Sequence, residues 1–419
     1  MKRTLSITLA ITALFIGPLI GPLAGAAAAQ SVKIGFVTTL TTPAAVIGND
    51  MRDAVHLAVS HLNGKMGDLD IEIIFEDDGL KPEIGKQKTD KLVKQDDVDF
   101  VAGYIWSHVL LASRKSVLDA GKFLISACAG PSRIAGRLCH ENFFSTGGQN
   151  DQAPMALGQA LDDDGVGSLY IIAPNYAAGK DMAAGVERTF KGKIAGKDLT
   201  KWPDQLDFSA ELAKAKASGA EGIFAFYPGK AGPAFIRQYQ QAGLHGKIAL
   251  YTVDTIDAIS LPRLQEAGMA GVLGSKMTKY WDRSLDNPQN KRFVEDFRAE
   301  YHRYPSFYAA QSYDAIHLIE HAVRAVGGDL TDRDGIRKAM ASAGFPSVRG
   351  RFTYGHNHFP IQDFYLRQVV EDSDGNWTTK IIATVFENHQ DSYAVTSFEI
   401  RGTLSHDQAW VPDGAHGRS

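Results

Sequence analysis

Short apolar runs alternate with longer amphipathic runs along most of this sequence. The first four apolar runs cover residues 32–37, 71–75, 98–102 and 123–126. Between the first two runs, five apolar residues recur at helical spacing: Met51, Ala54, Val55, Ala58 and Leu62. That spacing predicts a helix that buries one stripe of side chains on a sheet. The alternation predicts repeated βαβ units, hence an α/β fold with parallel sheets.

A second series of the same kind follows, so we expect two Rossmann-like lobes. The predicted strands of this series are 169–173, 223–226 and 248–252, and its predicted helices are 179–190, 209–217 and 233–242. Between the two series, residues 145–154 are polar, contain Gly and Asn, and lack periodicity. They form either a first hinge crossing between the lobes or an ordinary loop.

Later segments predict that the chain returns once to each lobe, which makes three hinge crossings. The predicted helices at 291–301 and 313–326 and the segment at 331–342 return to the first lobe, and residues 352–366 return to the second. The first lobe then comprises residues 31–148 plus 276–349, and the second comprises 149–275 plus 350–398. Residues 399–419 are polar and contain Gly, which is typical of a poorly ordered tail.

The first 29 residues have the pattern of a cleaved secretory signal peptide. Lys2 and Arg3 precede an apolar run at 5–23, and four alanines at 26–29 provide small residues for cleavage. The run is long enough to anchor a chain in a membrane, but Gly-Pro pairs at 17–18 and 21–22 interrupt it. We therefore expect a periplasmic protein whose mature chain is not inserted in the membrane.

The charge balance argues against a nucleic-acid partner. The chain has 44 Lys and Arg against 48 Asp and Glu, a net charge of -4. Removal of Lys2 and Arg3 leaves 42 against 48, which makes the mature chain more acidic still. Nucleic-acid binding draws on a basic surface, which such a chain lacks.

Only two cysteines occur in the sequence, Cys128 and Cys139. In an oxidising compartment they form either a disulfide that closes a short loop or two buried thiols. Their spacing does not decide between these alternatives, because a disulfide also requires the two Cα atoms to lie close together.

The motifs of common enzyme classes are absent from the sequence, so we expect neither catalysis nor a cofactor. There is no G-x-G-x-x-G, no G-x-x-x-x-G-K-[ST], no G-x-S-x-G and no H-E-x-x-H. His356 and His358 suggest a metal site, but no third ligand lies nearby in the sequence. Such a pair is more typical of solvated or structural histidines than of a metal site.

Candidate ligand-binding residues follow the predicted strands of the first lobe, because open α/β sheets bind ligands at the carboxyl ends of their strands. They are Tyr104, Trp106, Ser107, His108, Ala129, Gly130 and Ser132. Ser107 and His108 precede a predicted helical run from Val109, whose first N–H groups would face an anion, although Ser107 equally suits a helix cap. Gly130 lets the backbone of its loop approach a carboxylate, or it serves a tight turn without a ligand.

The second lobe offers five candidates at its own strand ends. They are Asn175, Tyr176, Tyr227, Gly229 and Asp254. We expect them to face the first-lobe candidates across one cleft. The aromatic residues among them either line the ligand or belong to the core.

Several segments, taken in their order along the chain, carry a resemblance to a known family. They are VKIGF at 32–36, EDD at 76–78, VAG at 101–103, APNYAAGK at 173–180 and DFS at 207–209. From about residue 32 to 398 the chain resembles the extracellular solute-binding proteins of branched-chain amino acid type ABC importers. The resemblance implies a type I periplasmic-binding fold, a small carboxylate ligand and an inner-membrane ABC permease as partner.

Other segments are similar to the branch of this family that is associated with aromatic acids. They are AGPS at 129–132, NFFST at 142–146, QNDQ at 149–152 and NHFPIQD at 357–363. The resemblance implies that the Ser107/His108 turn and the 129–132 loop hold the ligand carboxylate. It also implies that Tyr176 and Tyr227 close over the ligand from the second lobe.

The ligand class stays open between two alternatives. Amino-acid binders of the family place an acidic residue near Asp254 for the ligand ammonium, so a branched-chain or other hydrophobic amino acid is one alternative. Trp106 and His108 suit a flat ring, which favours an aromatic acid such as a benzoate or phenylpropanoid derivative. We therefore expect a transport receptor that closes over such an acid.

Two other classes of protein are less favoured. One is a sensor ectodomain, for which we find no membrane span after residue 398, and the other is a secreted enzyme.

Overall fold

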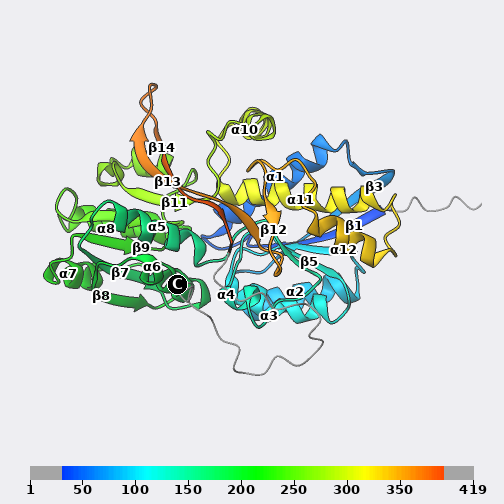
Figure 1. Cartoon of the computed structure of the whole chain (residues 1–419), viewed down its shortest axis with the longest axis horizontal. Helices are drawn as coiled ribbons and strands as arrows, with labels where there is room; N and C mark the ends of the chain where they lie inside the picture. Colours follow the sequence, from blue (N-terminus) through cyan, green and yellow to red (C-terminus); the bar gives the residue numbers. More distant parts are fainter. Residues whose placement is uncertain (1–30, 391–419) are drawn as a thin grey trace, which may run out of the picture.

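The computed structural model describes residues 31–390, which form two α/β lobes side by side (Figure 1). The first lobe is built on a six-stranded sheet with the order β2-β3-β1-β4-β5-β6. The second is built on an eight-stranded sheet with the order β12-β13-β11-β10-β9-β7-β8, and β14 pairs with β13. The predicted α/β fold with two parallel-rich sheets is confirmed.

Five parallel strands form most of the first sheet. They are β1 (Ser31–Thr38), β3 (Leu69–Asp77), β4 (Phe100–Gly103), β5 (Phe123–Ser126) and β6 (Phe143–Ser145), and the short β2 (Lys65–Met66) runs antiparallel to β3. All four strands predicted from apolar runs are present, and β5 has the predicted bounds. β4 and β5 are buried along their whole length because helices cover both faces.

Helices cover both faces of the first sheet (Figure 1). α1 (Ala45–His61) and α11 (Phe307–Ala325) pack together on one face, and α2 (Pro82–Lys94) and α3 (Ser107–Leu118) pack together on the other. α12 (Arg333–Ala341) packs on α11, α10 (Pro288–Tyr301) contacts α1, and the short α4 (Ser132–Ala135) follows β5. The stripe predicted from Met51 to Leu62 is buried in α1, apart from Leu62 itself, which is the partly buried C-cap.

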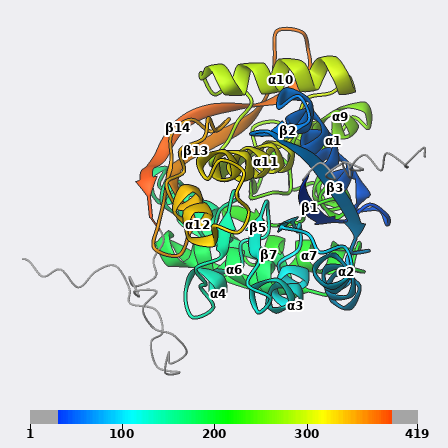
Figure 2. The ribbon, with the colours of Figure 1, turned by 90° about the vertical axis from the view of Figure 1, so that its right-hand side faces the viewer.

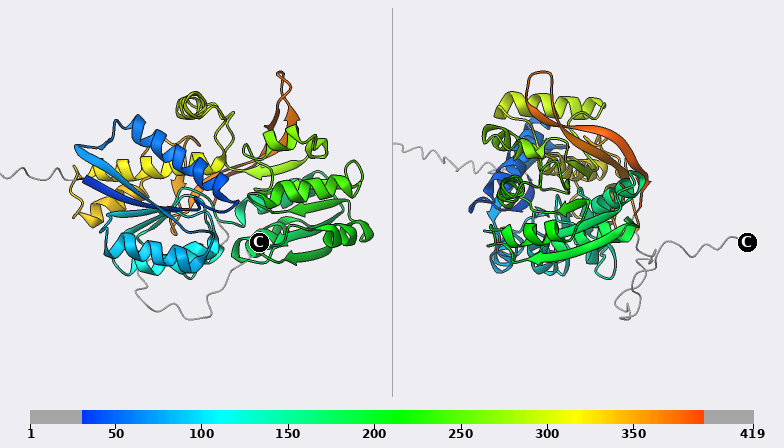
Figure 3. Two further views of the ribbon diagram at one scale, coloured as in Figure 1. Left: turned by 180° about the vertical axis from the view of Figure 1, so that it is seen from behind. Right: turned by 90° about the vertical axis from the view of Figure 1, so that its left-hand side faces the viewer.

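The second sheet combines a parallel half with an antiparallel ribbon. Its parallel strands are β7 (Ser168–Pro174), β8 (Lys193–Thr200), β9 (Gly222–Ala225), β10 (Ala249–Thr252) and β11 (Lys276–Lys279). Its antiparallel strands are β12 (Thr353–Tyr354), β13 (Pro360–Glu371) and β14 (Trp377–His389). Figures 2 and 3 show this ribbon from other sides, where it runs along the edge of the second lobe.

The helices of the second lobe follow its strands in sequence. They are α5 (Gln152–Asp163), α6 (Ala177–Thr189), α7 (Ser209–Ala217), α8 (Ala231–Gln241) and α9 (Leu261–Glu266), followed by a 3-10 turn at Ala270–Val272. α5 packs on α6 and on β11, β13 and β14. The chain thus enters the second lobe between the end of β6 and the start of α5, where we expected either a crossing or a loop.

One boundary differs from the sequence-based expectation. We assigned residues from 276 onward to the first lobe, but β11 pairs with β10 and β13 in the second sheet. The second crossing therefore follows Lys279. This four-residue strand does not appear as an apolar run in the sequence because it begins and ends with lysine. Met277 and Thr278 between the two lysines are nevertheless buried.

Within residues 31–390, no helix is both long enough and apolar enough to cross a membrane. The predicted signal peptide at 1–29 and the predicted polar tail at 399–419 lie outside the described residues.

Candidate ligand-binding site

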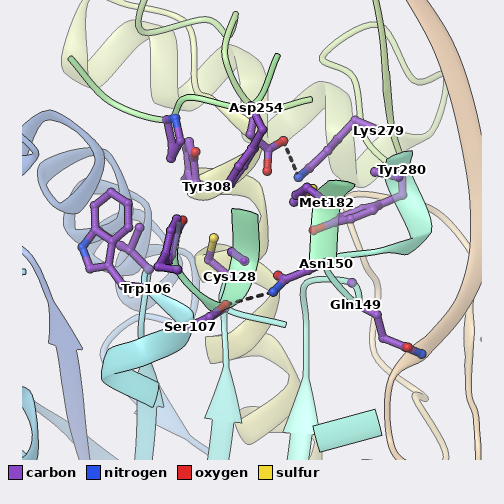
Figure 4. A pocket seen from close by; sticks show the side chains of 18 residues that line it. Trp106, Ser107, Cys128, Gln149, Asn150, Met182, Asp254, Lys279, Tyr280 and Tyr308 are labelled. Atoms are coloured by element: carbon purple, nitrogen blue, oxygen red, sulfur yellow. Dashed lines mark hydrogen bonds and ion pairs between the residues drawn. The ribbon is translucent and has the colours of Figure 1, made fainter. Parts of the chain in front are cut away.

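A cavity lies between the lobes, at the carboxyl ends of the parallel strands of both sheets (Figure 4). It measures about 500 Å³ when its open mouth is included, but the side chains close around it and leave a free volume of only about 40 Å³, so a ligand of ring size requires a wider separation of the lobes. Five of the residues predicted from the sequence line it: Trp106, Ser107, Ala129, Tyr176 and Asp254. They follow β4, β5, β7 and β10, as expected from the geometry of open α/β sheets.

The other predicted residues lie around this cavity or away from it. His108 and Asn175 line a neighbouring hollow. Gly130 and Gly229 each follow a lining residue in the chain without lining either space, and Ser132 lines neither space. Tyr104 and Tyr227 line neither space. The hydroxyl of Tyr104 lies 2.7 Å from Thr89 Oγ1, and that of Tyr227 lies 2.7 Å from Thr200 Oγ1. Both are fully buried core residues, the alternative that the sequence left open for aromatic side chains.

The first turn of α3 forms one wall of the cavity. The Ser107 hydroxyl accepts a hydrogen bond from Asn150 Nδ2 at 3.0 Å, shown as a dashed line in Figure 4. Next to it, the indole of Trp106 donates to Thr39 Oγ1 at 2.7 Å, which fixes the orientation of the ring. The N–H groups of a first helical turn have no partner within the helix, so this wall can accept an anion.

The loop at 129–132 uses its N–H groups within the protein. Ala129 donates to the carbonyl of Tyr104 at 2.9 Å, and Gly130 donates to Asn150 Oδ1 at 3.2 Å. The N–H of Ser132 donates to Asp181 Oδ2 at 3.0 Å. These groups, which the sequence suggested for a ligand carboxylate, instead connect the loop to its surroundings.

Gly130 permits a close backbone contact with the first crossing. A Cβ atom at this position would lie 1.8 Å from the carbonyl oxygen of Gly148, so no other residue fits without a backbone shift. The carbonyl of Gly130 accepts a hydrogen bond from the Asn150 N–H at 2.7 Å. The glycine therefore serves packing against the hinge.

Aromatic rings from both lobes meet at the side of the cavity. Tyr176 stacks on Trp202 with ring centroids 4.9 Å apart and 12° between the planes, and it meets His108 edge-on at 5.3 Å. Trp106 lies 5.5 Å from Trp202. Since Trp106 and His108 belong to the first lobe and Tyr176 and Trp202 to the second, these contacts hold the lobes together in a closed arrangement.

A buried ion pair occupies the end of the cavity formed by the second lobe. Lys279 Nζ lies 2.7 Å from Asp254 Oδ1, and the two side chains are only 6% and 9% exposed. The same ammonium lies 3.9 Å from the centre of the Phe307 ring, in cation–π contact. The cavity therefore contains a cation of its own next to its acidic residue (Figure 4).

Comparison with known proteins decides the family. A family model described as periplasmic binding protein matches residues 31–376. This chain belongs to the periplasmic binding protein family. Leu/Ile/Val-binding protein homolog 6 of Brucella abortus is 28% identical over 387 residues, which cover 87% of this chain and 94% of that protein.

Two solved structures resemble this periplasmic binding protein in fold. An ABC transporter solute-binding protein of R. palustris in complex with benzoate has a TM-score of 0.81 and 28% identity, and the match covers 88% of this chain and 99% of that one. A solute-binding protein of Rhodopseudomonas palustris BisB5 in complex with 3,4-dihydroxy benzoic acid shares the fold, with a TM-score of 0.80, 24% identity and coverage of 86% and 98%.

Asp181 on α6 joins the two lobes of this periplasmic binding protein beside the cavity. Its Oδ2 accepts hydrogen bonds from the Ser132 N–H of the first lobe and from Asn150 Nδ2 of the first crossing, each at 3.0 Å. Burial raises the pKa of the Asp181 carboxyl to about 6 despite these two bonds.

Cys128 lines the cavity as a protonated thiol, because burial raises its pKa to about 12. It is not joined to Cys139, so the disulfide that we considered is not formed. The described residues contain no group of three or more His, Cys, Asp or Glu placed to hold a metal ion.

Several lining residues of this periplasmic binding protein were missed in the sequence. They are Gln149, Asn150, Met182, Phe226, Lys279, Tyr280 and Tyr308. Asn150 lies in the QNDQ segment, which we associated with the aromatic-acid branch without giving its residues a role. Lys279 was missed because its strand was not recognised, and Tyr308 because it lies on a helix instead of at a strand end.

Proposed function

We propose that this protein is the periplasmic receptor of an ABC importer for aromatic carboxylic acids of the benzoate type. The N-terminal sequence supports export, and the family supports delivery of the captured ligand to an inner-membrane permease. The protein binds its ligand without transforming it. The buried Cys128 thiol is no nucleophile at neutral pH, since its pKa is about 12.

The ion pair between Lys279 and Asp254 is the observation that favours an aromatic acid over an amino acid as the ligand. An amino acid would place its ammonium beside Asp254, but the Lys279 ammonium already lies 2.7 Å from that carboxylate. A second cation at this buried position would have no counter-charge of its own, which costs several kcal/mol. A carboxylic acid without an ammonium avoids this cost, and the free N–H groups of the first turn of α3 stabilise its negative charge.

In the proposed mechanism, the ligand carboxylate binds the open first lobe at the Ser107 turn. Rotation of the second lobe about the three crossings then brings Tyr176 and Lys279 over the ligand. The aromatic ring of the ligand packs against Trp106 and Tyr176, in offset-stacked or edge-on contact. The benzoate bound by the R. palustris relative is a ligand of this size and charge.

A ligand panel tests the proposal on purified protein that has been unfolded and refolded to remove co-purified ligand. The melting temperature is recorded with benzoate, 4-hydroxybenzoate, cinnamate, leucine and valine. A ligand at 1,000 times its dissociation constant adds about 4 kcal/mol to the free energy of unfolding. We expect stabilisation by the aromatic acids alone.

Stabilisation by leucine or valine, and not by the aromatic acids, would overturn the choice of ligand. It would support the amino-acid alternative, which the name of the Brucella abortus relative favours. Recovery of each bound acid unchanged, by mass spectrometry after denaturation, tests the absence of catalysis.

A further inference from the structure

A second hollow, which we call the outer chamber, lies next to the cavity described above. It measures about 1550 Å³ including its open mouth, and three residues line both spaces: Trp106, Tyr176 and Pro228. The two spaces therefore adjoin at these side chains. A ligand that reaches past the Trp106 and Tyr176 rings from the cavity enters the outer chamber.

The outer chamber is lined mainly by rings and aliphatic side chains from both lobes. The first lobe contributes Pro43, Leu80 and His108, and the second contributes Trp202 and Leu206. Trp202 stacks on Tyr176 at 4.9 Å, so its ring presents an aromatic face beside the shared wall. Such a surface suits a flat apolar group of ring size.

Two nitrogens on residues of this chamber lack partners. Trp202 Nε1 and His108 Nδ1 are buried, and the residues that the structure describes provide no hydrogen-bond partner for either. The Trp202 N–H without an acceptor costs about 1–3 kcal/mol, so an oxygen atom on the bound group would be favourable beside it. His108 Nδ1 is an acceptor instead, because Nε2 donates to the Leu80 carbonyl at 3.4 Å and carries the ring proton.

We infer that the outer chamber binds a second, oxygen-bearing aromatic ring of the same ligand. The preferred ligand is then a two-ring aryl carboxylate, with its carboxylate ring in the inner cavity and its distal ring between Trp202 and Leu206. This inference rests on the proposed function and narrows its ligand class. Because the two spaces adjoin at Trp106, Tyr176 and Pro228, we take the distal part of the same ligand, instead of an independent molecule, as the occupant.

Isothermal titration calorimetry with benzoate and 4-phenoxybenzoate tests the inference. We expect one molecule of either acid per protein and at least about tenfold tighter binding of 4-phenoxybenzoate, because burial of a second ring adds apolar area. Leu206→Trp fills the outer chamber and should reduce the affinity for 4-phenoxybenzoate to that for benzoate. Binding of benzoate to this variant should change less than about twofold.

Two further variants keep the test independent of folding defects. Leu199→Trp places the same ring on a partly exposed leucine of the second lobe and should leave both affinities unchanged. Trp202→Phe keeps an aromatic face but removes the N–H, so it should weaken 4-phenoxybenzoate more than benzoate.

Equal or weaker binding of 4-phenoxybenzoate relative to benzoate in the unmodified protein would overturn the inference. So would the binding of two benzoate molecules, since the chambers would then be separate sites. Both outcomes leave the proposed function intact, whereas binding of leucine and neither aromatic acid refutes the proposed function itself.

Discussion

The guanidinium of Arg349 donates from Nε to the buried carboxylate of Asp314 over 3.1 Å. Its Nη1 also donates to the carbonyl of Gly147 at 3.3 Å and to Gln362 Oε1 at 2.8 Å. One side chain thus connects α11 of the first lobe, the first and third crossings, and β13 of the second lobe.

Arg349→Met should destabilise the protein by about 3–5 kcal/mol, because it leaves the fully buried Asp314 carboxylate without its cation. Urea unfolding monitored by circular dichroism measures this loss. Arg351→Met, which removes an exposed arginine two residues away, should change the free energy of unfolding by less than about 0.5 kcal/mol. Equal stability of the two variants would show that the Arg349 network does not stabilise the fold.

Lys279→Met should change the ligand preference. Without this ammonium, Asp254 is free to pair with a ligand ammonium, so we expect benzoate to bind at least about tenfold more weakly and leucine to bind more tightly. Calorimetric titration of both ligands checks this. Lys276→Met is the matched control, because Lys276 lies on the same strand but pairs with Asp164 at the surface. A benzoate affinity unchanged by Lys279→Met would remove Lys279 from the ligand site.

Tyr176 and Tyr227 should respond in opposite ways to truncation. Tyr176→Ala removes a cavity wall and should weaken ligand binding by about tenfold or more with little change in melting temperature. Tyr227→Ala leaves a hole beside Phe208 and Phe235 in the core and should cost about 3–5 kcal/mol of stability. Normal affinity in the Tyr176 variant would contradict its placement in the site.

Asp181 should make the stability of the closed protein depend on pH. Its pKa is about 6 in the native state against an ordinary value of 3.8, so the native state binds this proton more tightly than the unfolded state does. The corresponding stability is fully present below about pH 4 and is lost as the pH rises through 6.

Asp181→Asn keeps an oxygen acceptor for Ser132 and Asn150 but does not ionise. The unmodified protein should lose stability between pH 5 and pH 7.5, whereas the variant should not. The free energy of unfolding of the variant minus that of the unmodified protein should therefore be larger at pH 7.5 than at pH 5, as measured by urea unfolding at both values. The same stability difference at the two pH values would show that Asp181 does not titrate in this range.

Gly130→Ala should weaken both folding and ligand binding. Its Cβ would collide with the Gly148 carbonyl at 1.8 Å, so the loop must shift, at a cost of about 1–3 kcal/mol. Gly355→Ala is the control, since the nearest atom to a Cβ there lies 3.5 Å away. Thermal melting and benzoate titration of both variants compare the two positions.

The sequence predicted the sheets well and the cavity only in part, for physical reasons. Apolar runs such as 123–126 identify buried strands, and the rule that ligands bind at strand ends then places Ser107, Tyr176 and Asp254 at the cleft. The direction of a side chain at a strand end is not encoded in the same pattern. Tyr104 and Tyr227 therefore looked equivalent to Tyr176, although their hydroxyls bond within the core. The Lys279 pair required the pairing of β11, which is a long-range contact.

The Asn150 side chain makes three hydrogen bonds. It donates to the Ser107 hydroxyl in the cavity wall and to Asp181 of the second lobe, and it accepts from the Gly130 N–H. In the proposed mechanism, opening the lobes breaks the bond from Asn150 to Asp181, and the same Asn150 Nδ2 also holds the Ser107 hydroxyl. The time that a ligand stays bound and the geometry that selects it are therefore set by one side chain. Evolution of a new ligand preference around Ser107 would alter the release rate as well, without any substitution in the hinge.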